Sequence, residues 1–509
     1  IVRSAVAHGR IRNIDSADAR ALPGVHAVIT AADLGGNIPT IAVRSESQPS
    51  LDRVVQPVIA RDKVRYVGDP VAFVVAETVA QAKDAAEAVV ADIEALPAVT
   101  DARTAAQPGA PLVFDDVPGN LCLDFHAGDE AKTREAFATA AHVTKLRLVS
   151  NRIVVCAMEP RVAVAHYDKA NDRYIFHAGN QGAFGLKHQM ADLLGVKPAQ
   201  VRILTGNVGG SFGMKGSPYP EYAGLFHASK LLGRPVKWTD ERSGSFLSDQ
   251  HGRDHDFDAE LALDKDGTFL AVRLTGYANV GAYLANVGPL MGSAGVTRNL
   301  AAIYRTPLIE VSTKVAFTHT SSIGAYRGAG RPEANYFMER LIDTAAREMG
   351  LDGVAMRKRN HIRPEEMPFK TASGTVYDSG EFTTLLDKAL AALPGRKLIF
   401  TAGDVPHAQK VMERLGVAHH FEAIFDIVAG DYWPKPHRQI YDELVRRHDV
   451  DPTRAAFADL CKAVAPDQFD LHIRLNLGKG EAVLHAADLT EAYVDFNKGD
   501  VTDPTTLGG

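Results

Sequence analysis

The stretch Val201–Gly213, V-R-I-L-T-G-N-V-G-G-S-F-G, joins an apolar run of strand type, Val201–Leu204, to a loop with four glycines. Glycine lacks a Cβ, so its backbone adopts positive φ and approaches a bound group closely. Successive exposed N–H groups in such a turn form a concave surface that binds an anion. Helical patterns flank the stretch at Phe184–Leu194 and Glu221–Leu232. The loop therefore indicates either a site for an anionic cofactor or a tight structural turn.

The spacing of these glycines argues against a nucleotide site. The loop contains no G-x-G-x-x-G, and Lys215 is followed by Gly216 rather than by Ser or Thr, so neither nucleotide fingerprint is present. An anionic cofactor other than a plain nucleotide remains the functional interpretation.

A second glycine-rich loop, A-Y-R-G-A-G-R-P-E, runs from Ala325 to Glu333 and precedes a helical pattern over Ala334–Met349. Its two arginines, Arg327 and Arg331, carry planar guanidinium groups that suit phosphate or an oxyanion, and a helix N-terminus adds partial positive charge. The alternative is an ordinary helix start with two solvated arginines.

Composition excludes several classes of function for this 509-residue chain. The formal net charge of −6 gives no electrostatic case for binding nucleic acid or an anionic membrane, and no apolar run approaches the ~20 residues of a membrane span. The three cysteines supply no disulfide framework, zinc pair or iron–sulfur ligand set. A reducing, cytoplasmic setting is expected. The chain begins at Ile1 inside a strand-like run, which we interpret as a truncated start.

Residues 1–124 alternate strand-like and helical patterns. Strands are predicted at His26–Thr30 and Pro70–Val75, and a helix is predicted over Val79–Ala91 with Thr78 as its cap. A D-G turn inside Phe257–Gly281 predicts a hairpin further along the chain. Three arginines are predicted to be surface charges rather than ligands: Arg3, Arg10 and Arg65.

Several separate motifs, in order along residues 1–388, resemble the large subunit of molybdenum hydroxylases, the family of xanthine dehydrogenase, aldehyde oxidase and carbon monoxide dehydrogenase. The stretch Lys63–Ala72, K-V-R-Y-V-G-D-P-V-A, is similar to the α/β-hammerhead domain of that family. The motifs of the cofactor domain are N-V-G-G-S-F-G, A-Y-R-G-A-G-R-P-E, A-M-E-P-R (Ala157–Arg161) and V-K-W-T-D-E-R (Val236–Arg242).

The resemblance implies a molybdenum–pterin cofactor (molybdopterin, with a cytosine dinucleotide form as one option) and a small-molecule substrate. By resemblance, the cofactor-binding residues are Gln181, Gly209, Gly210, Ser211, Phe212, Gly213, Arg327, Gly328 and Ala329. Ala329 stands where purine-oxidising members carry a stacking aromatic residue. Copper-containing carbon monoxide dehydrogenases have a cysteine in the second loop, and this loop has none, which disfavours carbon monoxide as substrate.

One feature of the family is missing from the matched region. The general base of the family is a glutamate in a second cofactor domain, and nothing after Leu390 resembles that domain. Glu333 or Glu221 can be considered instead, although a lone glutamate at a helix start is more often structural. The catalytic residues are therefore unknown, no protein side chains are assigned as metal ligands, and the expected partners are iron–sulfur and flavin subunits, with no nucleic acid or membrane partner.

The sequence changes character near Leu386–Pro394. Residues 391–462 resemble a haloacid-dehalogenase-type pyrimidine 5′-nucleotidase, with Thr401, Lys435 and Asp459 at that family's second, third and fourth motif positions. Thr401 would donate to phosphate oxygens and Lys435 would neutralise their charge. The aspartate nucleophile motif is absent and Ala458 replaces a usual acidic residue, so this phosphate site is expected to be vestigial.

Residues 467–509 are predicted to contain a hairpin with its turn at Gly478–Gly480, and they weakly resemble the C-terminal end of ornithine/glutamate N-acetyltransferases. The expected fold is a multidomain α+β and α/β chain. Its predicted parts are a hammerhead (1–124), the first half of a molybdopterin-binding domain (125–388), a partial Rossmann-like lobe (391–462) and a β-rich end (467–509). Three functions stay open: a molybdenum-cofactor oxidoreductase subunit, a nucleotidase-like phosphohydrolase, and a chimeric chain without activity.

Overall fold

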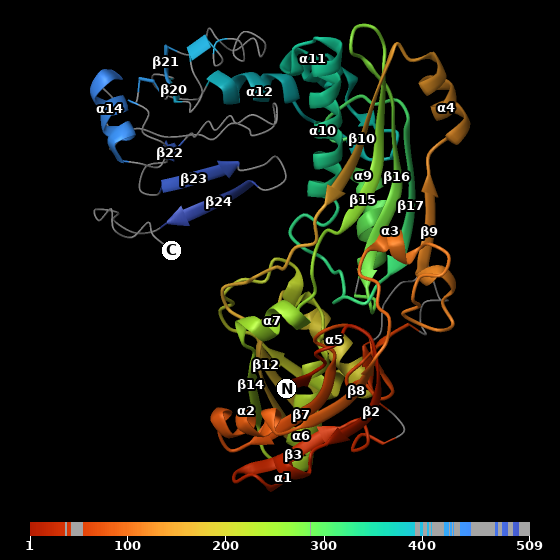
Figure 1. The fold of residues 1–509 in the computed structure, drawn as a ribbon, viewed down its shortest axis with the longest axis vertical. Coiled ribbons are helices and arrows are strands. Elements are labelled where there is room, and N and C mark those ends of the chain that lie inside the picture. Colours follow the sequence, from red (N-terminus) through yellow and green to blue (C-terminus); the bar gives the residue numbers. More distant parts are fainter. Residues whose placement is uncertain are drawn as a thin grey trace. The chain divides into compact units, whose positions relative to one another are not determined.

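A computed structural model describes residues 1–35, 38–41, 54–285, 287–391 and several short pieces of the C-terminal region: 398–400, 405–406, 409, 422–426, 428–429, 431, 438–448, 474–476, 481–486 and 492–497. The chain divides into two compact units (Figure 1). Unit 1 comprises Ile1–Leu341 with Lys370–Tyr377, and unit 2 comprises Ile342–Phe369 with Asp378–Gly509. The domain boundaries expected from the sequence remain predictions.

The N-terminal part of unit 1 contains two three-stranded sheets, ordered β1-β7-β3 and β6-β2-β8. Helices α1 and α2 pack against β3 and β7 of the first sheet, and Thr78 caps α2 through a reciprocal bond with Gln81. The elements are β1 (Val2–Arg3), β2 (Gly9–Asp15), α1 (Ala17–Ala21), β3 (Val25–Thr30), β4 (Thr40–Ile41), β5 (Gln56–Pro57), β6 (Lys63–Val64), β7 (Pro70–Ala76), α2 (Val79–Glu87), β8 (Val90–Ala95) and α3 (Ala102–Ala105).

A four-stranded sheet ordered β13-β12-β11-β14 follows, and α5 and α6 pack on it. Gly224 of α6 lets the helix approach β7, because a Cβ there would lie 2.8 Å from the Phe73 ring; α6 accordingly runs beside β3 and β7 (Figure 1). The elements are β11 (Val162–Asp168), β12 (Arg173–Ala178), α5 (Ala183–Leu194), β13 (Val201–Leu204), α6 (Pro220–Leu232), β14 (Val236–Thr239) and α7 (Arg242–Ser248).

The largest sheet of unit 1 has the order β10-β15-β16-β17-β9, and its strands are drawn as long arrows in Figure 1. The predicted hairpin is β15–β16, and only the β16–β17 pair is parallel among these neighbours. Phe337 of α10 packs on Phe257 of β15 with ring centres 5.3 Å apart. The elements are β9 (Leu121–Ala127), α4 (Glu130–Thr139), β10 (His142–Ser150), β15 (His255–Leu263), β16 (Phe269–Gly281), α8 (Gly288–Leu290), α9 (Val296–Asn299), β17 (Ile309–Phe317) and α10 (Arg331–Met349), with the short pair β18 (Phe369–Lys370) and β19 (Val376–Tyr377).

Unit 2 contains the end of α10, several helices and two small sheets. In one of them β20 and β21 pair in parallel, and in the other β22, β23 and β24 pair antiparallel. The β22–β23 pair spans the predicted turn at 478–480, which confirms the hairpin. The elements are α11 (Gly353–Asn360), α12 (Phe382–Ala391), β20 (Leu398–Phe400), β21 (Ala423–Phe425), α14 (Arg438–His448), β22 (Arg474–Asn476), β23 (Glu481–Ala486) and β24 (Ala492–Asn497).

Two predictions about the N-terminal region are wrong. The helix predicted over Val79–Ala91 ends at Glu87, because residues from Val90 onward form β8 and pair with β2. Arg3 and Arg65 are not surface charges. The Arg3 side chain is only 10% exposed and pairs with Glu221, while the Arg65 guanidinium carbon lies 4.5 Å from the centre of the Phe114 ring.

Candidate functional site: two glycine-rich loops

The first loop, Gly206–Gly213, starts where β13 ends and uses its glycines where the backbone requires them. The φ angles of Gly210 and Gly213 are +99° and +110°, and Phe212 between them is also left-handed at +51°. A Cβ on Gly213 would lie 2.1 Å from the carbonyl oxygen of Ala325, which belongs to the second loop, Ala325–Arg331. Only glycine therefore permits this approach of the two backbones.

The two loops are joined by a backbone hydrogen bond in which the Arg327 N–H donates to the Phe212 carbonyl at 2.9 Å. The Arg327 guanidinium lies 5.8 Å from the centre of the Phe212 ring. These contacts hold the two loops against each other, although more than a hundred residues separate them in the sequence. Next to Arg327, Gly328 has a φ of +89°, and the Ala329 N–H donates to the Tyr326 carbonyl at 2.8 Å.

Gln181 lies after β12 and is hydrogen-bonded to the first loop. Its Oε1 accepts hydrogen bonds from the Ser211 hydroxyl at 2.6 Å and from the Gly213 N–H at 2.7 Å. Because a backbone N–H can only donate, the atom facing it must be the amide oxygen, which fixes the orientation of this amide. The NH₂ group of Gln181 has no acceptor among the described residues and offers two donors to a ligand.

The second loop is supported by Arg253 and Glu333. Arg253 donates to the carbonyl oxygens of Tyr326 at 3.0 Å and Arg327 at 2.9 Å, and to Glu333 Oε1 at 3.1 Å. The other oxygen of Glu333 accepts the Gly330 N–H at 2.9 Å. Glu333 is therefore structural, and the suggestion that it could replace the missing base is not supported by its contacts.

The anion-binding surface predicted for the first loop is smaller than the sequence suggests. The Gly209 and Gly213 N–H groups already donate to Glu159 and Gln181. Within the described part of the chain, no acceptor faces the N–H groups of Gly210, Ser211 and Phe212, and the Arg327 guanidinium has no hydrogen-bond partner. Three backbone donors, an amide NH₂ and one cation thus remain for a ligand, a donor set that fits the phosphate and oxo groups of a pterin cofactor.

A buried charge network joins two further motifs of the family resemblance, because Arg161 of Ala157–Arg161 pairs with Asp240 of Val236–Arg242 at 3.5 Å. Arg161 is fully buried; its Nε donates to Asp249 at 2.6 Å, its Nη1 donates to Glu221 at 2.8 Å, and its guanidinium stacks 3.8 Å from the Tyr219 ring centre. Burial alone would raise the pKa of Glu221, but Arg161 and Arg3 hold it at about 2. Glu221 is therefore a permanent carboxylate in an ion pair and does not fit the role of a general base.

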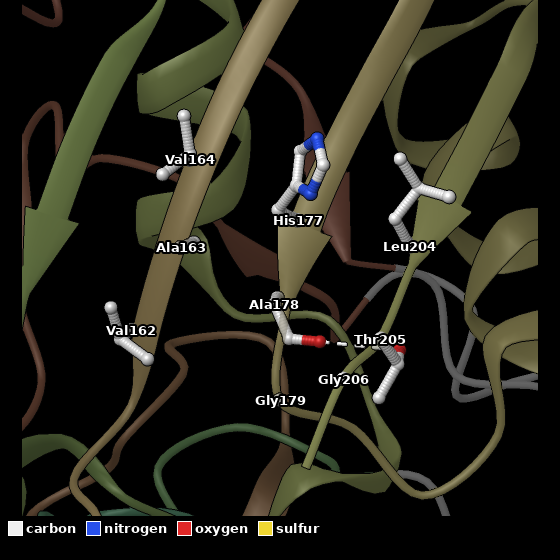
Figure 2. A pocket seen from close by; sticks show the side chains of 9 residues that line it. All are labelled: Val162, Ala163, Val164, His177, Ala178, Gly179, Leu204, Thr205 and Gly206. Atoms are coloured by element: carbon white, nitrogen blue, oxygen red, sulfur yellow. Dashed lines mark hydrogen bonds between the residues drawn. The ribbon is translucent and has the colours of Figure 1, made fainter. Parts of the chain in front are cut away.

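A hollow of about 460 Å³ lies on the outer face of the four-stranded sheet, beside the start of the first loop (Figure 2). Thr205 donates its hydroxyl hydrogen to the Ala178 carbonyl at 3.2 Å at one end of it. The lining residues are Val162, Ala163, Val164, His177, Ala178, Gly179, Leu204, Thr205 and Gly206. None of the predicted cofactor residues lines this hollow, so it is not the predicted cofactor site.

The remaining predictions concern the C-terminal region and metal binding. Thr401, Lys435 and Asp459, predicted as a vestigial phosphate site, lie outside the described residues. Among the residues that are described, no group of three or more His, Cys, Asp or Glu side chains could hold a metal ion. In the same part of the chain, no helix is long and apolar enough to cross a bilayer.

Comparison with known families agrees with this architecture. Residues 1–97 match the a/b hammerhead domain of aldehyde oxidase and xanthine dehydrogenase, and residues 113–361 match the molybdopterin cofactor-binding domain. The carbon monoxide dehydrogenase large chain of Hydrogenophaga pseudoflava is 34% identical over 407 residues, which are 77% of this chain and 50% of that protein. Subunit gamma of the 6-hydroxypseudooxynicotine dehydrogenase complex of Paenarthrobacter nicotinovorans is 34% identical over 402 residues, again 77% and 50%.

Solved structures give the same result. The CO dehydrogenase from Oligotropha carboxidovorans superimposes with a TM-score of 0.73 at 31% identity, over 82% of this chain and 52% of the other. Quinoline 2-oxidoreductase from Pseudomonas putida 86 gives 0.72 at 31% identity, over the same shares.

The fold and the matched domains define a chain that carries a hammerhead domain followed by a molybdopterin cofactor-binding domain. In this N-terminal part the chain belongs to the family of xanthine dehydrogenase and carbon monoxide dehydrogenase large subunits. It spans about half the length of the curated relatives that it matches.

Proposed function

We propose that the two joined loops form one half of the cradle for a molybdenum–pterin cofactor in a hydroxylase or dehydrogenase of aldehydes or N-heterocycles. The observation that carries the proposal is the Arg327–Phe212 hydrogen bond, because it brings the free donors of both loops to one place. The cofactor, when bound, supplies the two-electron redox chemistry.

In this proposal each group of the chain has a limited task. The N–H groups of Gly210, Ser211 and Phe212 bind the anionic part of the cofactor, and the Arg327 guanidinium neutralises its charge. The NH₂ group of Gln181 orients an oxo or carbonyl oxygen, since its own oxygen is already held by Ser211 and Gly213. Gly328 has a φ of +89°, and a Cβ there would lie 2.8 Å from the Pro332 ring, so glycine is required for the turn between Arg327 and Ala329.

The substrate, partners and location are part of the same proposal. Iron–sulfur and flavin subunits would accept the electrons, the cofactor would be molybdopterin with the cytosine dinucleotide form as one option, and the setting would be cytoplasmic. Carbon monoxide is disfavoured because the second loop lacks a cysteine. Hydroxylation needs a general base that neither Glu221 nor Glu333 can provide, so we expect no turnover by these residues alone.

The test is cofactor retention by loop variants, measured as pterin fluorescence after oxidation. Arg327→Met removes a charge-assisted contact of roughly 1.5–3 kcal/mol, which should weaken retention about 10- to 150-fold. Gly210→Val should also lower retention, because a side chain at this positive φ is strained and blocks close approach. Arg202→Met changes an exposed arginine of β13 and is the control.

Arg327→Met and Arg202→Met should melt like the parent in circular dichroism, whereas Gly210→Val should melt lower, because a φ of +99° costs a non-glycine residue roughly 1–2 kcal/mol. Retention that is equal in the parent, Arg327→Met and Arg202→Met would contradict the proposal. Measured hydroxylation of an aldehyde by the chain alone would contradict the expectation that another base is needed.

For the C-terminal region, a nucleotidase-like phosphohydrolase remains the second candidate, carried by the Thr401, Lys435 and Asp459 motif positions. The parallel pair β20–β21 is compatible with a Rossmann-like lobe there. We also propose, from the resemblance alone, that residues 467–509 correspond to the C-terminal end of an ornithine/glutamate N-acetyltransferase. Three incomplete resemblances in one chain suggest in addition that the chain is chimeric.

A further inference from the structure

Lys215 lies immediately after the first loop, yet its ammonium group is not available to a ligand. Its side chain is 1% exposed, and Nζ donates to the Glu159 carbonyl at 2.8 Å and to Glu159 Oε1 at 2.9 Å. A buried ammonium requires a compensating partner, and the Glu159 carboxylate supplies it. In nucleotide-binding loops a lysine in a comparable place binds phosphate, but the fingerprint of those loops is absent here and Lys215 contacts Glu159 instead.

Glu159 in turn fastens the first loop. Its Oε2 accepts the Gly209 N–H at 2.7 Å, and its own N–H donates to the Gly209 carbonyl at 3.0 Å. The contact is so close that a Cβ on Gly209 would lie 2.5 Å from the Glu159 Cβ. On the other side, a Cβ on Gly179 would lie 2.9 Å from Glu159 Oε1. Glycines at both positions thus make room for this carboxylate.

We propose that Lys215 and Glu159 are a positioning pair that holds the first loop in its ligand-ready shape. Lys215 fixes the carboxylate, and the carboxylate fixes Gly209, which precedes the three N–H groups that have no acceptor among the described residues. The pair also cancels its own charge, so the cations of the two loops that remain for a ligand are Arg327 and Arg331, and Arg331 donates to the Gly328 carbonyl at 3.2 Å. The positioning role stands on the geometry alone; its meaning for a cofactor rests on the proposed function.

Hydrogen–deuterium exchange of the amides of residues 206–213 tests the pair without any cofactor. Lys215→Met should increase exchange of the two hydrogen-bonded amides of this loop, those of Gly209 and Gly213, at least tenfold, while the amides of β15 and β16 stay protected. Lys237→Met, at an exposed lysine of β14, should change nothing and is the control. Lys215→Arg keeps the charge and should restore part of the protection, which a loss of packing alone would not explain.

Glu159→Gln gives a second, milder variant if Lys215→Met does not fold. A glutamine replaces one of the two carboxylate oxygens with an NH₂ group, and these oxygens now accept from Gly209 and from Lys215 separately, so one of the two donors would face another donor. We expect an intermediate increase in exchange. Unchanged protection of the loop in a folded Lys215→Met or Glu159→Gln protein would overturn the proposal.

Pterin content, measured on the same samples, separates this proposal from the proposed function. A loosened loop with less pterin supports both. A loosened loop with unchanged pterin leaves the positioning pair established and refutes the cofactor role of the loop.

Discussion

Replacing Gly213 with alanine is the sharpest perturbation of the joint between the two loops. The new Cβ would lie 2.1 Å from the Ala325 carbonyl oxygen, so one of the two backbones must move about 0.9 Å to restore even 3.0 Å. Such a movement separates the atoms of two hydrogen bonds. One joins Gly213 to Gln181 at 2.7 Å, and the other joins Arg327 to Phe212 at 2.9 Å.

The expected cost has two parts. A non-glycine residue at a φ of +110° costs roughly 1–2 kcal/mol, whatever space surrounds it. Loss of the two hydrogen bonds costs about 0.5–1.5 kcal/mol each, so the total is roughly 2–5 kcal/mol. Much of this free energy can be released by local separation of the loops rather than by unfolding of the whole unit.

Gly195→Ala is the matched control. Gly195 follows α5 with a φ of +66°, and a Cβ there would meet nothing within 4 Å. This variant therefore carries only the backbone cost of about 1–2 kcal/mol. The difference between the two variants isolates the contact between the loops.

The assay combines denaturant unfolding with hydrogen–deuterium exchange of residues 206–213 and 325–331. Gly213→Ala should expose both segments to exchange and lower stability more than Gly195→Ala does. If the two variants have the same unfolding free energy and the same loop exchange, the joint between the loops does not have the energetic role described here.

Three further predictions concern stability and the C-terminal region. Arg161→Met leaves Asp249 buried without its cation and leaves Arg3 as the cation paired with Glu221, so it should destabilise unit 1 by about 3–5 kcal/mol in denaturant unfolding. Arg10→Met, at an exposed arginine, should change the stability by less than about 0.5 kcal/mol. Burial lowers the pKa of His319 to about 4, so the folded chain takes up this proton at a lower pH than the unfolded chain does, and the stability that is full above pH 6.5 falls by up to about 2 kcal/mol at pH 5. His319→Asn keeps an acceptor for the Val99 N–H and should reduce this loss of stability. An unchanged dependence of the unfolding free energy on pH in His319→Asn would refute the assignment. Hydrolysis of an aryl phosphate or a pyrimidine monophosphate should stay at background, and activity that Lys435→Ala removes would show that a nucleophile comes from elsewhere in the chain.

The local features of the site could be predicted from the sequence. The strand Val201–Leu204, the helix that begins near the second loop and the β15–β16 hairpin follow from short-range patterns of apolar residues and glycines. The predicted end of the helix at Ala91 is wrong. Apolar residues continue at helical spacing after Glu87, but from Val90 onward they form a strand that pairs with β2, and this pairing with a distant segment cannot be read from the local pattern.

The contacts that support the site could not be predicted, because they join residues far apart in the chain. Arg3 and Glu221 are 218 residues apart, and Lys215 and Glu159 are 56 apart. Nothing near Arg3 in the sequence indicates that it is buried. Nothing near Lys215 indicates that its ammonium group pairs with Glu159. Signals do exist in retrospect, since Glu159 and Arg161 lie in one of the motifs that carry the family resemblance.

The most direct test of the central claim is the molybdenum and pterin content of the purified full chain. Protein from a host that makes the cofactor should contain molybdenum and pterin in equal molar amounts, below one per chain because only half of the cradle is formed by these loops. Protein from a host unable to make the cofactor should contain neither. Equal molybdenum from both hosts, or no pterin from the cofactor-producing host, would contradict the claim that the joined loops bind the cofactor.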